Sequence, residues 1–291
     1  MDGELRIAEC ELRIVGDNPR AEGVSGFDGQ SAAGDRAVKS GRRFDSAHLH
    51  NEHPQVGLPL EQAQRLARIL ARRLAPACAR LEVAGSIRRG KAWVKDVELV
   101  AIPRAGELDA LLARLEREGD EGGRRIYRSR AALEERLAGM GLPFVHVPDV
   151  RRWGERYKRF YVWSSRQHGI VAVDLFLATR DNWGAIFAIR TGPGDFSQAL
   201  VTHLKSRTPY RQQDGQVVVQ ATGAVVPVPE EADYFALAGL PVIPPERRTV
   251  AELRRALAEA RRAGMRPAPP PDLKSAPGVE YPSGGQLALP L

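Results

Sequence analysis

The sequence predicts an α+β fold of one or two domains. Its 291 residues, 43% hydrophobic and 27% charged, have the composition of a globular protein with a sizeable core. Helical and strand-like patterns are mixed without the strict alternation that a doubly wound parallel sheet requires. The patterns stop at a Gly-, Ser- and Asp-rich leader over 1–56 and at a proline-rich tail over 265–291. We therefore expect a folded body between a low-order leader and a flexible tail.

The first half of the body predicts a helix, then strands and helices in turn. Residues 60–74 place alanine and leucine on one helical stripe, which Pro76 ends. A short apolar run at 81–84 leads into a glycine-bracketed turn, and the run at 97–102 is short enough for a buried strand. The other elements of this half are two helices and two strands, expected at 107–118, 130–139, 157–163 and 170–178.

The second half predicts three more helices and a hairpin. Two helices are expected at 182–190 and 194–206. Asp214-Gly215 separates two strand-like segments of four residues, and this dipeptide favours a two-residue hairpin turn. An amphipathic helix over 250–262 ends the body.

The charge distribution favours a polyanionic partner. Lysine and arginine number 43 against 36 aspartate and glutamate residues, which gives a net charge of +7. The leader is net acidic, whereas residues 57–265 carry 34 basic and 24 acidic side chains, a net charge of +10. A basic body of this kind is typical of proteins that bind nucleic acid or nucleotides.

Cysteine content and hydropathy predict the compartment. Cys10 and Cys78 are too few for a disulfide framework. No apolar run approaches the ~20 residues of a membrane-spanning helix, and the N-terminal residues lack the basic-then-apolar pattern of a signal peptide. We expect a cytoplasmic protein that contacts no membrane.

The turn GSIRRG, from Gly85 to Gly90, suits a phosphate group. Glycines let the backbone approach a phosphate closely, the Ser86 hydroxyl and backbone N–H groups donate to it, and an arginine such as Arg89 supplies a charged fork. Taken alone, such a turn is more often an ordinary turn with solvated arginines.

Three acids complete a pattern for metal-assisted phosphoryl chemistry. Asp96 and Glu98 lie two residues apart at the start of a strand, so both carboxylates face the same side. Asp174 lies inside the apolar run 171–177, where an acid is costly unless a cation compensates it. Three carboxylates suit Mg²⁺, and two such ions can clamp the attacking and leaving oxygens of an in-line displacement. The combination predicts nucleotidyl transfer.

The run GSIRRGKAWVKDVELVAIP resembles the palm motif of the nucleotidyltransferase superfamily, specifically the family X branch typified by DNA polymerase beta. The resemblance covers roughly residues 60–248 in three separated blocks. Within this family, the sequence is similar to compact members of the phage and prophage type. It implies a nucleotidyltransferase palm over 57–180, with a mixed β-sheet flanked by helices, and a thumb-like α/β subdomain over 181–264.

The resemblance also implies roles for the residues at matching positions. Asp96, Glu98 and Asp174 stand at the catalytic positions that hold two Mg²⁺ ions, with Mn²⁺ as an alternative. The residues at nucleotide-binding positions are Gly85, Ser86, Arg89, Arg190, Thr191 and Gly192. The implied reaction adds a nucleotide from an NTP or dNTP to the 3′ end of DNA or RNA, in DNA repair or in a mobile element.

Departures from the family pattern bear on the substrate. Glu98 stands where the family has aspartate, and Ile189 with Arg190 replaces the aromatic pair that gates sugar identity, so weak sugar discrimination is expected. The Gly-x-Gly hairpin with which the family grips DNA is not found in the sequence. Nucleotidylation of RNA, protein or a small molecule stays open, as does a non-catalytic nucleic-acid or clamp adaptor.

Two further segments predict partners. Basic residues are interleaved with aromatic ones from 151 to 163, which suits phosphate contact and base stacking; the alternative is a strand with a buried aromatic side. The predicted nucleic-acid contacts there are Arg152, Arg156, Lys158 and Arg159. The C-terminal peptide resembles those by which bacterial polymerases and repair proteins bind the sliding clamp. Its predicted docking residues are Gln286, Leu287, Leu289 and Leu291.

Overall fold

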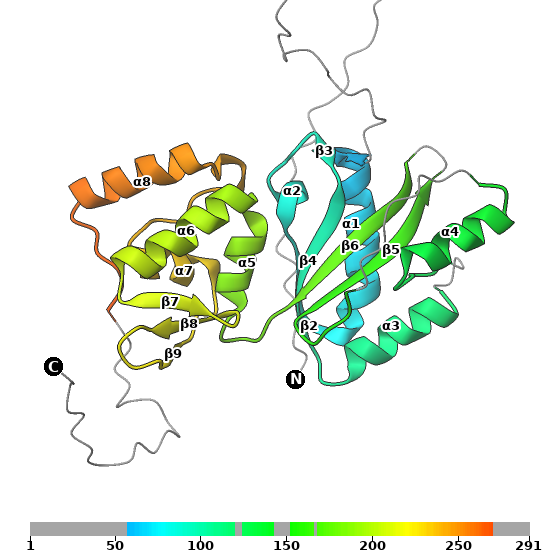
Figure 1. Ribbon diagram of the computed structural model, residues 1–291, viewed down its shortest axis with the longest axis horizontal. Coiled ribbons are helices and arrows are strands. Elements are labelled where there is room, and N and C mark those ends of the chain that lie inside the picture. The colour runs from blue at the N-terminus through cyan, green and yellow to red at the C-terminus, as the bar shows by residue number, and fades with distance from the viewer. Residues whose placement is uncertain (1–56, 120–123, 143–151, 166–167, 270–291) are drawn as a thin grey trace, which may run out of the picture. The chain divides into compact units, whose positions relative to one another are not determined.

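The computed structural model describes residues 57–119, 124–142, 152–165 and 168–269 (Figure 1). All of these fall within one compact unit of the chain, Glu52–Leu291. The architecture is α+β with a mixed sheet flanked by helices, as predicted. The predicted leader and the predicted clamp-docking residues lie outside the described residues.

A four-stranded mixed sheet organises the first half, with strand order β2-β4-β6-β5. The central pair, β4 and β6, is parallel, and the two outer pairs are antiparallel. The strands are β2 (Cys78–Val83), β4 (Asp96–Pro103), β5 (Tyr157–Ser165) and β6 (Gly169–Leu177).

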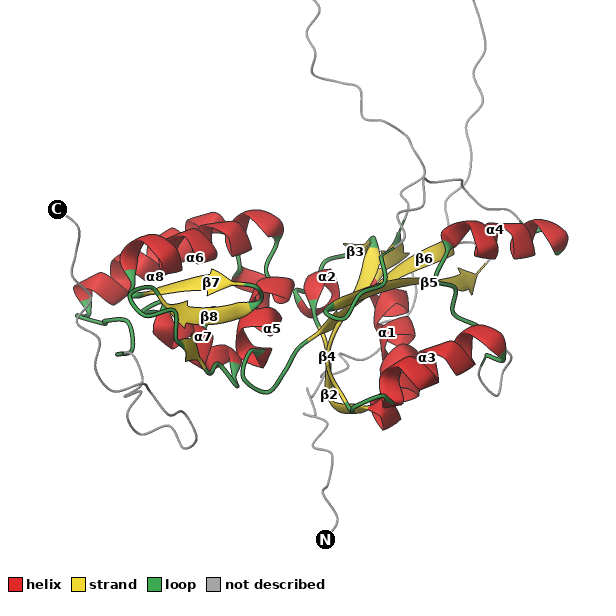
Figure 2. Cartoon of the chain, turned by 60° about the horizontal axis from the view of Figure 1, so that its bottom comes forward, coloured by secondary structure: helices red, strands yellow, loops and turns green. Residues whose placement is uncertain are grey.

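One face of this sheet is covered by α1 (Leu60–Leu74) and α3 (Glu107–Arg117). Figure 2 shows α3 and α4 (Arg130–Gly139) on opposite sides of β5 and β6. The buried side chains of α1 recur at three- and four-residue spacing, as the sequence predicts. The core of this face includes Ala67, Leu70, Val97, Leu99, Leu112, Val173 and Leu175.

The opposite face carries two separate apolar contacts. Trp183 and Phe187 of α5 (Trp183–Thr191) pack on Phe176 of β6. Further along the same strand, α4 packs on Ile170. Asp174 lies between these two covered stretches of β6, so the helices leave this part of the face to polar groups.

The second half is built on a three-stranded antiparallel sheet, β7-β8-β9, with its own apolar core. Asp214 and Gly215 form the predicted hairpin turn, both with positive φ (51° and 81°). The elements are α6 (Gly194–Arg207), β7 (Tyr210–Gln213), β8 (Gln216–Val219), β9 (Val225–Val226), α7 (Glu231–Leu237) and α8 (Val250–Arg262).

Several short elements differ from the sequence-based expectations. The turn after β2 closes into one helical turn, α2 (Gly85–Arg88), and a small ribbon pairs β1 (Leu58–Pro59) with β3 (Trp93–Val94). Neither this ribbon nor α7 was predicted, because both are too short to show a hydrophobic period. In the part of the chain that the structure describes, no helix combines the length and apolar character needed to cross a membrane.

Candidate functional site

The register between β4 and β6 brings the three predicted acids onto one face of the sheet. Glu98 lies directly opposite Asp174, and Asp96 lies opposite Ala172, one pleat repeat away. Directly opposed residues of neighbouring strands point to the same side. Segments separated by more than seventy residues therefore contribute to one acidic cluster.

The cluster is partly buried, and its charges oppose one another. Burial raises the pKa of Glu98 to about 7, and the charges of Asp96 and Asp174 add to this effect. Burial, with the charge of Asp174, also raises the pKa of Asp96. A cation would relieve this repulsion, and carboxylates are the protein ligands that Mg²⁺ prefers. The chemistry of these donors therefore fits the predicted ion. In this conformation, however, no three His, Cys, Asp or Glu side chains among the described residues form a group that could hold a metal ion.

Asp174 is held by two side chains of β5. The Arg159 guanidinium donates from Nε to Oδ1 at 2.6 Å and from Nη2 to Oδ2 at 2.7 Å. The Tyr157 hydroxyl donates to Oδ1 at 2.6 Å. Asp174 is only 5% exposed, so these contacts provide much of the compensation for its buried charge. A metal ion at Asp174 requires Arg159 to give up at least one carboxylate oxygen.

The α2 turn packs directly against Glu98. Gly85 has φ +62°, and a Cβ atom built on it would lie 1.7 Å from Oε2 of Glu98. The backbone N–H of Lys91 donates to the Ser86 carbonyl at 3.0 Å and closes the turn. Glycine at position 85 is therefore required twice, for its backbone conformation and for the close approach to the acid.

Replacing Gly85 with alanine should destabilise the protein more than the same change at Gly90. Both glycines have positive φ, but a Cβ at Gly90 meets open space. The Gly90 variant should lose about 1–2 kcal/mol of unfolding free energy from backbone strain alone. The Gly85 variant should lose at least ~1 kcal/mol more, because overpacking displaces Glu98. Urea unfolding followed by circular dichroism measures both; equal losses would contradict the packing of α2 on Glu98.

A cavity of about 320 Å³ extends from Glu98 to the turn between α5 and α6. It brings Glu98 together with Arg190 and Gly192, two residues predicted to bind the nucleotide. The Arg190 guanidinium lies over the Phe176 ring at 4.0 Å, which holds this cation beside the acidic face. The lining residues are Glu98, Ile189, Arg190, Gly192, Gly194, Ser197, Gln198 and Val201.

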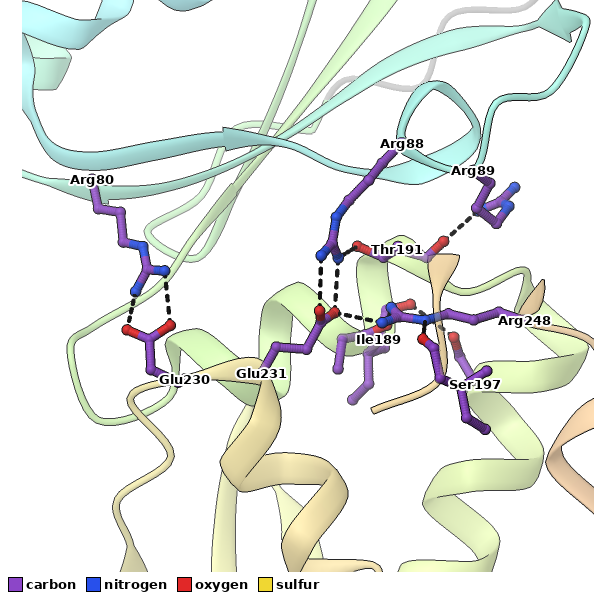
Figure 3. Close-up of polar contacts among 11 residues, drawn as sticks. Arg80, Arg88, Arg89, Ile189, Thr191, Ser197, Glu230, Glu231 and Arg248 are labelled. Atoms are coloured by element: carbon purple, nitrogen blue, oxygen red, sulfur yellow. Dashed lines mark hydrogen bonds and ion pairs between the residues drawn. The ribbon is translucent and has the colours of Figure 1, made fainter. Parts of the chain in front are cut away.

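The two arginines of the turn bind residues of α5 and α7 (Figure 3). Arg89 donates to the Thr191 carbonyl at 2.6 Å. Arg88 donates to Oγ1 of Thr191 at 2.8 Å and to both carboxylate oxygens of Glu231 at 2.8 Å. The Thr191 side chain, predicted to lie near the nucleotide, is thus fully buried and bonded to Arg88.

Glu231 and Arg248 are polar residues of this region that the sequence did not indicate. Arg248 is 1% exposed, forms an ion pair with Glu231 at 2.8 Å, and donates from Nε to the Ile243 carbonyl at 2.9 Å (Figure 3). Glu231 is the first residue of α7, which begins with a capping box between Glu230 and Asp233. That Glu-x-x-Asp pattern after a proline was the available signal for the helix.

The structure separates the four basic residues predicted to contact nucleic acid. Arg152 and Arg156 are exposed. Lys158 is 4% exposed, forms an ion pair with Asp109 at 3.0 Å, and donates to a backbone carbonyl, so its place is in the interior rather than on a binding surface. Arg159 points to the opposite side and binds Asp174. The alternation of a strand separates Lys158 from Arg159.

Comparison with known proteins gives no further assignment. No protein-family model matches the chain, and no curated protein sequence matches it.

Proposed function

We propose that this protein is a Mg²⁺-dependent nucleotidyltransferase that transfers a nucleotide from a nucleoside triphosphate to a nucleic-acid 3′ end. The observation that carries the proposal is the parallel register that sets Glu98 opposite Asp174, with Asp96 on the same face. The glycine turn of α2 packs on Glu98, and the cavity begins at the same residue. The reaction needs an acidic cluster, a turn that can bind phosphate and a cavity, all at one place.

Asp96, Glu98 and Asp174 would hold the metal ions. When bound, two ions would neutralise the triphosphate and stabilise the charge on the attacking and leaving oxygens. The raised pKa of Glu98 means that ion binding also competes with a proton at this carboxylate near neutral pH. Arg159 would give up one oxygen of Asp174 while its other hydrogen bond keeps the carboxylate oriented.

The triphosphate would bind at the α2 turn. Ser86 supplies a hydroxyl there, and Arg89 supplies a guanidinium that donates to the Thr191 carbonyl. A phosphate is a stronger acceptor than a carbonyl, so Arg89 would turn from Thr191 toward the triphosphate. Arg88, bonded to Glu231 and Thr191, would hold the turn in place and not contact substrate.

The cavity would receive the sugar and base. Its wall is formed by Ile189, Arg190 and Gly192, with no aromatic side chain among its lining residues. Because no aromatic ring in this wall could clash with a 2′-hydroxyl, the cavity should accept both ribonucleotides and deoxyribonucleotides. Arg190 would add positive charge on the side of the nucleotide that faces Glu98.

Nucleotide incorporation by the full-length protein tests the proposal. Labelled dNTPs and NTPs are supplied with single-stranded DNA, primed DNA, and RNA oligonucleotides at low salt. We expect Mg²⁺-dependent extension of at least one 3′ end by both sugar types, and its complete loss with EDTA. Label that appears on the protein or on a small molecule would reassign the acceptor. Failure of the triphosphate to bind in the presence of Mg²⁺ or Mn²⁺ would contradict the proposal.

A further inference from the structure

Trp93 is half exposed, at 51%, and is flanked by two exposed lysines, Lys91 and Lys95. Two of the six lysines of the chain therefore lie beside this one tryptophan, whereas arginine is the commoner basic residue of the protein. We call Lys91, Trp93 and Lys95 the Trp93 surface. An indole offers a flat ring on which a base can stack, and the two neighbouring lysines supply positive charge, so this segment suits a ligand that carries both an aromatic ring and phosphates.

The ribbon of β1 and β3 fixes the direction of the Trp93 side chain. Trp93 pairs with Pro59 and Val94 pairs with Leu58, and Val94 is completely buried. Since neighbouring strand residues point to opposite sides, burial of Val94 turns Trp93 outward. The backbone N–H of Leu60 adds a hydrogen bond to the Ala92 carbonyl at 3.0 Å, so the exposed ring stands on an ordered backbone.

The Trp93 surface adjoins the candidate site at both ends. Lys91 closes the α2 turn through its hydrogen bond to the Ser86 carbonyl, and Lys95 directly precedes Asp96. The segment thus runs from the proposed triphosphate turn to the first acid of the cluster. Anything bound on it lies next to the reacting groups without filling the cavity, whose lining comes from Glu98, α5 and α6.

We propose that the Trp93 surface binds a single-stranded segment of the nucleic-acid acceptor, with one base stacked on Trp93 and phosphates on either side bound by Lys91 and Lys95. A free nucleotide has phosphates on one side of its base only, whereas a strand presents them on both sides, which matches one exposed lysine before and one after Trp93 in the chain. A base within a duplex is already stacked on both faces, so the ring favours an unpaired base. The identification of this strand as the acceptor rests on the proposed nucleotidyl transfer.

Binding of a fluorescein-labelled oligo(dT) to the full-length protein, followed by anisotropy over a series of salt concentrations, tests this surface. Trp93→Ala should weaken binding about tenfold, within the range for loss of one stacked base. Trp93→Phe should stay within about threefold of wild type, because a phenyl ring still stacks. The double variant Lys91→Gln/Lys95→Gln should make the slope of log K against log salt less negative by about 1.4, the value for two phosphates of a single strand.

Matched controls are Val242→Ala, which removes an exposed apolar side chain elsewhere, and Arg262→Gln, which removes an exposed charge at the end of α8. Both should bind the oligonucleotide as wild type does. Wild-type affinity and salt slope in the Trp93→Ala and double-lysine variants would overturn the proposal, even if the protein transfers nucleotides. Weakened binding in these variants of a protein that incorporates no nucleotide would support the surface and contradict only the proposed transfer.

Discussion

Replacing Asp174 with asparagine should lower Mg²⁺-dependent nucleotide incorporation by at least about a thousandfold, since the charge stabilisation that a bound ion supplies amounts to several kcal/mol. Asparagine keeps the shape of the side chain and one acceptor oxygen for Tyr157 and Arg159. It removes the charge that faces Glu98 across the parallel strands. Single-turnover incorporation at saturating nucleotide measures the loss in the chemical step.

The control for this variant is Asp214→Asn in the hairpin turn. Asp214 has φ 51°, a conformation that asparagine also adopts readily, and its side chain is 78% exposed. This control should incorporate nucleotides at the wild-type rate. Circular dichroism at the assay temperature should show that the Asp174 variant is folded. Activity within tenfold of wild type in the folded variant would remove Asp174 from the proposed site.

The hydrophobic period of the sequence predicts the longer helices and strands of this fold. The two-residue alternation of side chains in a strand predicts which face of the sheet each acid lies on. The stripes of α1 and α8 and the turn at Asp214-Gly215 lie where the sequence places them. Asp96 and Glu98 share a face because they lie two residues apart in one strand. Their meeting with Asp174 depends on the register between β4 and β6, which no local pattern contains.

The partners of the buried basic residues could not be predicted from the sequence. Lys158 and Arg159 form one basic segment in the sequence, yet one is buried beside Asp109 and the other binds Asp174. Alternation predicts that they separate, but it does not predict which partner each finds, because the partners come from other elements. Arg248 follows a proline-rich segment in which a solvated cation is the ordinary expectation, and it is fully buried because α7 brings Glu231 to it.

Replacing Glu231 with glutamine should reduce the free energy of unfolding by about 3–5 kcal/mol, the usual cost of removing one partner of a buried ion pair. Glu231 receives two hydrogen bonds from Arg88 and an ion pair from Arg248, whose side chain is fully buried. Glutamine has nearly the same shape but no charge, so Arg248 would remain as a buried cation without its counter-charge. Urea unfolding at pH 7 measures the loss.

The pH dependence of the same variant gives an independent test. Burial alone would raise the pKa of Glu231, but hydrogen bonds from Arg88 and the charge of Arg248 outweigh it and hold the pKa below its ordinary value. A lowered pKa in the folded state adds stability above the ordinary carboxyl pKa, and this stability is lost as the pH falls through the folded-state value. The stability difference between wild type and variant should therefore be largest near neutral pH and should narrow below about pH 4.

Glu259→Gln is the matched control, because it makes the same chemical change on an exposed face of α8. The Glu259 side chain is 59% exposed and lies 4.0 Å from Arg255, so its loss should cost less than about 0.5 kcal/mol at any pH. A similar small cost for Glu231→Gln would mean that Arg88 and Arg248 do not depend on this carboxylate. In that case α7 would not be what holds the α2 turn against the acidic cluster, and Arg88 would be available to the triphosphate beside Arg89.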